Sequence, residues 1–334
     1  FIYRFVKGET DYMVGAYPFA WFVPEYEHAG RRVWEQELNL TPAEASALHA
    51  MLQREIKPDL REYRYNYVKD NCATRFIDRL DSAAQARPVF SDSITYGTFR
   101  NEMRAYNRNY PWYQFGIDLA LGSGIDYSLT GREEMFVPME LMQKVATAHF
   151  ADGRPMVKAT RVLVEGRGDQ QLPPTPWWCS PLAVMILVFA AAAILSLYEA
   201  RRWATSLFFI LAGLTGCVSA FLVFVSSHEA TSPNMLTLWL NPLQLLLGIC
   251  LWWRHTRFCA VAVAWYNIAV IIALLLIWPM QSQSANPAIF PLLGAALLLS
   301  ATYAIIAPKE SYKNRHEPNS HNSARKPGGI PHRA

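Results

Sequence analysis

Hydrophobic and polar residues divide the chain into parts with different patterns. Over residues 1–170 apolar positions are interspersed with acids, arginines and tyrosines, whereas residues 177–308 are almost continuously apolar. A soluble domain buries one face of each element, but a membrane helix is apolar all round. The sequence therefore predicts a soluble domain at 1–170, a membrane domain at 171–308 and a polar, disordered tail at 309–334.

Apolar runs mark the predicted membrane helices, and each is close to the ~20 residues that a helix needs to cross a bilayer. Tryptophans stand near their ends, where an amphipathic ring prefers the membrane interface. The pattern predicts an all-α integral membrane domain of about five helices. These cover residues 181–198, 203–226, 235–253, 258–279 and 288–307.

Basic residues are distributed unevenly over the loops between these runs. The first loop holds Arg201 and Arg202 and the third holds Arg254, His255 and Arg257, whereas the second and fourth contain no Lys or Arg. Since basic loops stay cytoplasmic, the first and third loops and the basic tail are predicted to lie inside. Five crossings then place the soluble domain in the periplasm of a Gram-negative cell. Four or six crossings with an intracellular domain are the alternative.

The soluble half mixes predicted helices with predicted strands, so its fold class is α+β. Thr41-Pro42-Ala43-Glu44 has the pattern of a capping box with proline at the first helical position. Helical spacing of apolar residues follows it, whereas tyrosines alternate with other residues just before Asp70. The predicted helices cover 42–57 and 132–150, the latter broken at Pro138, and the predicted strands cover 61–68 and 155–165.

The first residues have the alternation of a strand, with Phe1, Tyr3 and Phe5 separated by other residues. A chain that starts inside such a pattern, without an initiator methionine, is expected to be N-terminally truncated. An export signal, and any site residue upstream, would then precede Phe1.

Cys72 is the candidate nucleophile. At this point the spacing of side chains changes from the alternation of a strand to the spacing of a helix. Asp70 or Asn71 is a natural N-cap for that helix. Free N–H groups and the helix dipole favour a thiolate at a helix start, and Lys69 and Arg75 act in the same direction. Asp70 and Asn71 are suited to orienting a base or an acyl oxygen. A structural, buried thiol is the alternative, as is a disulfide with Cys179.

Other chemistry is less well supported by the residues. Asp118, Asp126, Glu133 and Glu134 are candidate site acids, although caps and surface charges have the same appearance. The chain shows no phosphate loop, no zinc-ligand spacing and no basic-aromatic patch for nucleic acid. No cofactor is therefore predicted.

Several longer motifs occur together. They are KGETDYMVGAYPF at 7–19, DNCATRF at 70–76, TFR at 98–100, FGIDLALGS at 115–123, EEMFVP at 133–138 and HEATSPNMLTLWLNPL at 228–243. This set resembles the Lnb-type periplasmic domain and the membrane part of the same proteins, over nearly the whole chain except the tail. The Asn-Cys helix start is also similar to the permuted papain-like group, which includes lecithin–retinol acyltransferase and NlpC/P60-like enzymes.

The resemblance implies N-acylation of lipoproteins at the inner membrane, with a membrane phospholipid and a lipoprotein N-terminus as partners. Cys72 would take an acyl chain as a thioester, and the α-amino group of the lipoprotein's N-terminal cysteine would then receive it. A histidine base precedes the cysteine in the papain-like pattern, and this chain lacks that motif. The base is therefore expected upstream of Phe1, with His228 as a second candidate.

Two other functions are consistent with the same sequence features. A thiol hydrolase or amidase of the cell envelope would use Cys72 with water in place of an amine. A non-enzymatic binding module anchored in the membrane would leave the Cys72 thiol buried and inert.

Overall fold

The structure, a computed structural model, describes residues 2–91, 94–167, 174–198 and 200–316, with side chains described up to residue 306. It divides into two compact units. The N-terminal unit comprises residues 1–184, 217–238 and 277–289, and the C-terminal unit comprises 185–216, 239–276 and 290–334. Each unit is therefore assembled from segments that are far apart in the sequence.

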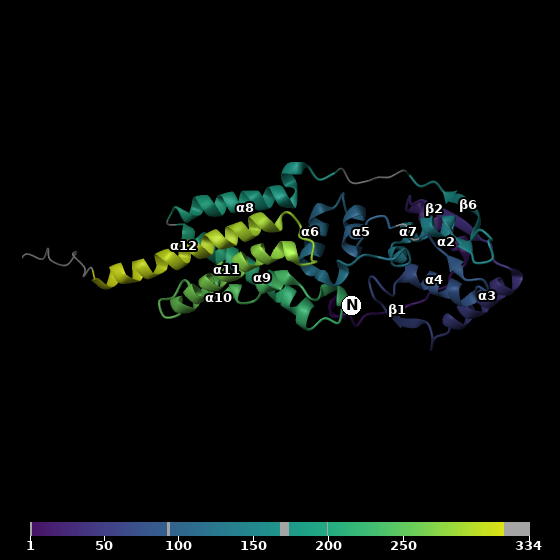
Figure 1. The fold of residues 1–334 in the computed structure, drawn as a ribbon, viewed down its shortest axis with the longest axis horizontal. Coiled ribbons are helices and arrows are strands. Elements are labelled where there is room, and N and C mark those ends of the chain that lie inside the picture. Colours follow the sequence, from purple (N-terminus) through teal and green to yellow (C-terminus); the bar gives the residue numbers. More distant parts are fainter. Residues whose placement is uncertain (1, 92–93, 168–173, 199, 317–334) are drawn as a thin grey trace, which may run out of the picture. The chain divides into compact units, whose positions relative to one another are not determined.

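The N-terminal unit combines short helices with short antiparallel strands, in keeping with the predicted α+β composition (Figure 1). Its helices are α1 (Ile2–Lys7), α2 (Phe19–His28), α3 (Pro42–Glu55), α4 (Cys72–Ala83), α5 (Phe99–Tyr106), α6 (Pro111–Ala120) and α7 (Pro138–Thr147). Its strands are β1 (Asp11–Met13), β2 (Val33–Leu38), β3 (Glu62–Arg64), β4 (Pro88–Val89), β5 (His149–Phe150) and β6 (Val157–Val164). Among the described residues these pair two by two, as β1 with β3, β2 with β6 and β4 with β5.

Most elements of this unit follow the sequence signals. The capping box before α3 is present, because the Thr41 hydroxyl accepts from the Glu44 amide and the Glu44 carboxylate accepts from the Thr41 amide. The strand predicted at 155–165 is β6. The helix predicted at 132–150 is a short 3₁₀ turn followed by α7, and Pro138 occupies the first position of α7.

The predicted strand at the start of the chain is wrong, because Ile2–Lys7 form α1; Phe1 lies outside the described residues. Gly8 at φ +78° ends the helix in a Schellman motif, in which the Gly8 amide donates to Phe5 and the Glu9 amide to Arg4. Ser226 and Ser227 donate to the terminal carbonyls of Val6 and Lys7. This helix end depends on residues more than two hundred positions away, so the local alternation does not determine it.

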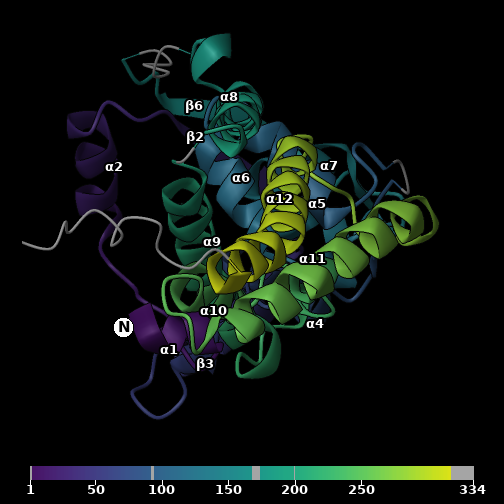
Figure 2. The ribbon, with the colours of Figure 1, turned by 90° about the vertical axis from the view of Figure 1, so that its left-hand side faces the viewer.

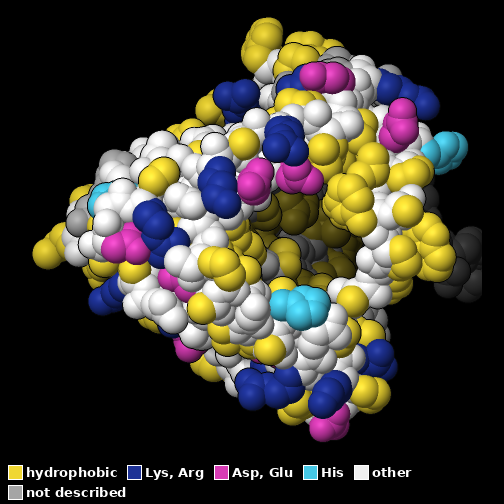
Figure 3. Space-filling view, turned by 90° about the vertical axis from the view of Figure 1, so that its right-hand side faces the viewer, with side chains coloured by type: hydrophobic (Ala, Val, Ile, Leu, Met, Phe, Trp, Pro, Cys, Tyr) yellow, Lys and Arg dark blue, Asp and Glu magenta, His cyan; other side chains and the backbone are white. Residues whose placement is uncertain are grey.

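The core of the N-terminal unit lies on the apolar face of α4. Ile77 and Leu80 are each 1% exposed and contact Met135, Val145 and Phe150 from the segments that follow. Burying an aliphatic side chain of this size contributes about 1.5–3 kcal/mol, so this face fixes the direction of α4. Figure 3 shows one face of the unit, which is hollowed and has hydrophobic side chains on the walls of the hollow.

The apolar helices after residue 180 are α8 (Pro181–Ser196), α9 (Arg201–Phe224), α10 (Gln244–Cys250), α11 (Arg257–Ile277) and α12 (Ile289–His316). Among the described residues three helices are long and apolar enough to cross a membrane, at Arg201–Phe224, Arg257–Met280 and Ile289–Ile306, and the apolar helix Pro181–Ser196 is shorter. Figures 1 and 2 both show α11 lying alongside α12. Three candidate spans are fewer than the five predicted.

The run predicted as one helix at 235–253 is instead a 3₁₀ turn at Met235–Leu238, an irregular stretch and the short helix α10. Pro242 lacks a backbone N–H and cannot continue a helix. The Asn241 side chain accepts from the Leu243 amide at 3.0 Å and so favours a turn here. Within the C-terminal unit, Gln244 also pairs with the buried amide of Asn267 at 2.8 Å.

The last helix also differs from the prediction. α12 continues through residues 309–316, which the sequence predicts to belong to the disordered tail. Residues 317–334, the remainder of the predicted tail, lie outside the described residues.

Candidate active site

Cys72 is the first residue of α4, and its side chain is exposed. Asn71 is the N-cap, since its side-chain oxygen accepts from the amides of Ala73 and Thr74 at 2.8 and 3.1 Å. The Thr74 hydroxyl accepts from the Asn71 amide in return, which completes a capping box. The predicted helix start at Cys72 is thus confirmed. Because the cap occupies the next two amides, the Cys72 amide is the N–H of this turn that has no acceptor among the described residues.

The residues on either side of Cys72 form a separate charged group. Arg75 donates to the Asp70 carboxylate at 2.7 and 3.0 Å, and its guanidinium carbon lies 3.5 Å from the centre of the Tyr63 ring. Lys69 pairs with Glu229. Asp70 and Arg75 therefore neutralise each other and brace the approach to α4, and Tyr63 holds Arg75 in place.

A pocket of about 410 Å³ opens beside Cys72. Its polar lining comes from tyrosines and asparagines, and most of its other lining is apolar. Such a surface is suited to a hydrocarbon chain that reaches a polar reacting group. The lining residues are Tyr65, Tyr67, Asn71, Cys72, Met103, Tyr106, Asn107, Phe136, Val137, Pro138 and Met139.

Asn71 connects two walls of this pocket. Its side-chain nitrogen donates to the carbonyl of Phe136 and to the carbonyl of Tyr67, both at 3.0 Å. The side chain is buried, with 5% of the residue exposed, and uses its oxygen and both N–H groups. One amide thereby fixes the start of α4 against the segment that carries the EEMFVP motif.

Behind the pocket, buried carboxyl groups gather around Tyr106. The Tyr106 hydroxyl donates to Glu140 at 2.7 Å, and burial together with this bond raises the tyrosine pKa. Glu102 is fully buried, and burial, with Glu140 and Glu134 nearby, raises its pKa to about 7. Lys144 pairs with Glu134 at 2.7 Å. The cluster keeps Tyr106 protonated and holds its ring in the pocket wall.

Two residues proposed from the sequence lie elsewhere. Asp118 is buried and pairs with Arg100 and Arg104, each at 3.1 Å, and does not line the pocket of Cys72. The His228 ring nitrogen lies 2.7 Å from the Phe5 carbonyl, so this histidine fastens the end of α1. Among the described residues that line the pocket, none is a histidine.

The sequence pattern does not predict the tyrosines of the pocket. It predicts Tyr65 and Tyr67 in a strand at 61–68, but β3 ends at Arg64 and these residues continue as a loop into the pocket wall. No neighbouring residue in the sequence indicates that Tyr106 lines the pocket, because its hydroxyl is held by Glu140 from a different helix.

The thiols of the chain are unpaired. Cys72 and Cys179, weighed as a disulfide from the sequence, are both free. Within the described residues no group of three or more His, Cys, Asp or Glu side chains is placed to hold a metal ion.

Comparison with known families identifies two parts of the chain. The family model of the Lnb N-terminal periplasmic domain matches residues 1–102, which include Cys72 and its cap. The model of the Lnb transmembrane domain matches residues 174–311. The chain belongs to the Lnb family. No curated protein and no solved structure matches it.

Membership of the Lnb family confirms the main organisation predicted from the sequence. The chain is an inner-membrane protein with a periplasmic N-terminal domain and a transmembrane domain. The permuted papain-like relationship stays a prediction, and so do the cytoplasmic position of the tail and the number of crossings.

Proposed function

We propose that this Lnb-family protein is a membrane-bound acyltransferase that N-acylates the N-terminal cysteine of bacterial lipoproteins through a thioester on Cys72. The observation that carries the proposal is the position of the thiol. It is exposed at the first residue of α4 and lines a largely apolar pocket, in a protein whose other domain lies in the membrane. A lipid-borne acyl chain has to meet its acceptor in such surroundings.

In the first step, the Cys72 sulfur attacks the carbonyl carbon of an acyl ester on a phospholipid or on the lipoprotein's own lipid. A carbon–sulfur bond forms, the ester carbon–oxygen bond breaks, and the alcohol leaves with the proton given up by the thiol. In the second step, the α-amino nitrogen attacks the thioester, the carbon–sulfur bond breaks, and the proton released by the amine returns to the sulfur. The products are an N-acyl amide and the free enzyme.

The start of α4 provides electrostatic support for both steps. Each passes through a tetrahedral oxyanion, which a preorganised N–H group stabilises. Since the Asn71 cap occupies the amides of Ala73 and Thr74, the Cys72 amide is the donor we assign to the oxyanion. The positive end of the helix dipole acts in the same direction. None of the described residues that line the pocket is a histidine, so the base that accepts the thiol proton stays unassigned.

The test is acylation in cells that lack their own lipoprotein N-acylation. The protein, expressed from its complete gene, is compared with Cys72→Ser and with Cys179→Ser as the matched control, and the N-terminal lipopeptide is weighed by mass spectrometry. We expect an added or relocated acyl chain with wild type and Cys179→Ser, and at least about a thousandfold less with Cys72→Ser.

Other outcomes separate the alternatives. Release of free fatty acid or of a cleaved peptide that depends on Cys72, without an N-acyl product, would identify a thiol hydrolase. An unchanged lipopeptide with wild type, given confirmed expression, would reject lipoprotein acylation and favour a binding module.

A further inference from the structure

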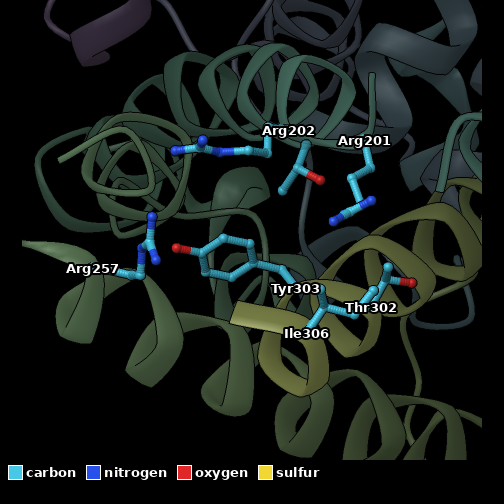
Figure 4. Close-up of a pocket in the computed structure, with 7 residues that line it drawn as sticks. Arg201, Arg202, Arg257, Thr302, Tyr303 and Ile306 are labelled. Atoms are coloured by element: carbon cyan, nitrogen blue, oxygen red, sulfur yellow. The ribbon is translucent and has the colours of Figure 1, made fainter. Parts of the chain in front are cut away.

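Three arginines meet at a hollow in the C-terminal unit (Figure 4). Arg201 and Arg202 come from the first turn of α9, and Arg257 is the first residue of α11. Thr205, Thr302, Tyr303 and Ile306 complete the lining of this small, open hollow. Figure 4 shows the Tyr303 hydroxyl directed toward the guanidinium of Arg257.

The side chains described around this hollow carry charge of one sign. Within the described part of the chain its lining contains three guanidinium groups and no acid. Among the described residues, neither Arg202 nor Arg257 pairs with a carboxylate, and Arg202 is positioned by the Leu251 carbonyl at 3.1 Å and by the Trp252 ring. The N-terminal ends of α9 and α11, which also carry partial positive charge, lie at the same place. Guanidinium forks and hydroxyl donors together match the oxygens of a phosphate group.

The tryptophans around the hollow place it at the level of lipid headgroups. Trp203 follows Arg202 directly, and its ring lies 4.4 Å from that of Trp252. Trp203 and Trp253 are 71% and 58% exposed. Exposed indoles of membrane proteins concentrate where the headgroups meet the hydrocarbon. A phosphate in the hollow is therefore at the depth of a lipid phosphate.

The surface next to the arginines also favours a lipid over a free anion. Ile306 lines the hollow, Ile305 beside it is 53% exposed, and Leu207, one turn further along α9, is 62% exposed. These side chains offer an apolar surface that leads away from the phosphate position. A molecule with a phosphate at one end and acyl chains at the other would contact both parts.

We propose that Arg201, Arg202 and Arg257 bind the phosphate of an anionic phospholipid, with hydroxyl groups of the same hollow as additional donors. The leaflet is the one that faces the basic loops, which the positive-inside rule predicts to be cytoplasmic. The site uses residues of the C-terminal unit alone, so it does not depend on the acyl-transfer proposal.

The test measures lipid binding to the purified full-length chain by native mass spectrometry, with phosphatidylglycerol and phosphatidylcholine titrated separately. Wild type is expected to retain phosphatidylglycerol preferentially. Arg257→Gln should weaken that binding about fivefold, and the triple glutamine variant of Arg201, Arg202 and Arg257 should remove the preference. Arg254→Gln is the matched control, because Arg254 is an exposed arginine of the same loop that does not line the hollow.

Several results would overturn the proposal. One is equal retention of the two lipids by wild type, and another is an equal loss with Arg254→Gln and Arg257→Gln, which would indicate general surface charge. Displacement of phosphatidylglycerol by millimolar inorganic phosphate would assign the hollow to a free anion. Thermal unfolding without added lipid verifies that each variant is folded, and Arg201→Gln replaces Arg257→Gln if the latter is not.

Discussion

The side-chain nitrogen of Asn71 donates a hydrogen bond to the backbone carbonyl of Phe136, 3.0 Å away and 65 residues further along the chain. The oxygen of the same side chain caps α4. The residue that starts the helix of Cys72 therefore also attaches that helix to another wall of the pocket. The helix cap and the geometry of the pocket both depend on the Asn71 side chain, so a substitution that removes this side chain should disrupt both.

Asn71→Ala removes both functions, whereas Asn71→Asp keeps an oxygen for the cap and loses the donors to Phe136 and Tyr67. We expect Asn71→Ala to lower the free energy of unfolding by about 2–4 kcal/mol and Asn71→Asp by about 1–3 kcal/mol. Thermal unfolding of the full chain in detergent measures both. Asn101→Ala is the control, because Asn101 makes one exposed bond to the Tyr96 carbonyl. Equal stability of Asn71→Ala and wild type would contradict this account of the cap.

Arg100 is fully buried and holds the polar centre of the N-terminal unit. Its guanidinium donates to Asp126 and Asp118 and to the carbonyls of Leu121 and Gly122. The single ammonium group of a lysine cannot donate to all of these acceptors at once. Arg100→Lys should therefore destabilise the protein by about 3–5 kcal/mol.

The matched control for Arg100→Lys is Arg161→Lys. Arg161 has a 62% exposed side chain and pairs with Glu37 at 3.4 Å on the surface, so its change is expected to cost less than about 1 kcal/mol. Denaturant unfolding of both variants gives the comparison. Similar losses for the two would show that the Arg100 network does not stabilise the unit in the way we describe.

Glu102 should give the protein a pH dependence near neutrality. Its pKa rises from 4.5 to about 7 on folding, because burial and the nearby Glu140 and Glu134 disfavour its charge. The folded state then binds more protons than the unfolded state. The stability that Glu102 contributes is therefore complete below pH 4.5 and is lost as pH rises through 7. Glu102→Gln cannot ionise and should lose less stability than wild type between pH 5 and pH 8.

The measurement for Glu102 is the unfolding temperature at several pH values for wild type, Glu102→Gln and Glu62→Gln. Glu62 is an exposed acid of β3 and should reproduce the wild-type curve. Parallel curves for wild type and Glu102→Gln would refute the raised pKa of Glu102 as the cause of the pH dependence.

Glu44 should make the stability of the protein fall as the pH is lowered, the opposite of the effect of Glu102. Hydrogen bonds from Arg154, together with those from the Thr41 and Gln85 amides, lower its pKa from 4.5 to about 2. The stability it contributes is present above pH 4.5 and is lost as pH falls toward 2. Glu44→Gln is expected to be about 1–3 kcal/mol less stable than wild type at pH 7, with the difference shrinking below pH 4.5 and approaching zero near pH 2.

Denaturant unfolding at pH 7, 5 and 3 tests Glu44, and Glu37→Gln serves as the control because the Glu37 side chain is 47% exposed. A stability difference between Glu44→Gln and wild type that stays constant down to pH 3 would rule out titration of this carboxylate.

Local chemistry determines the features that the sequence predicted correctly. The capping box at Thr41 and the helix start at Cys72 are fixed by residues within four positions, so both could be predicted. The role of Asp118 could not, since Asn286, which donates to it at 2.9 Å, lies 168 residues away. The contact of Tyr106 with Glu140 has the same long-range character. The break at Pro242 was available in the sequence, but the high hydrophobicity of 235–253 concealed it.

The polar bonds that complete the N-terminal unit come in part from the connections between the membrane helices. Ser284 accepts from Arg104 at 2.7 Å, and Asn234 donates to the Leu119 carbonyl at 2.9 Å. Gln283 in turn donates to Asn234 at 2.9 Å. The soluble part and the membrane part of the chain are therefore not interchangeable modules. A gene fusion that exchanged one half between distant relatives would leave buried acceptors and donors unmatched, so the two halves are expected to be inherited, and to diverge, as a pair.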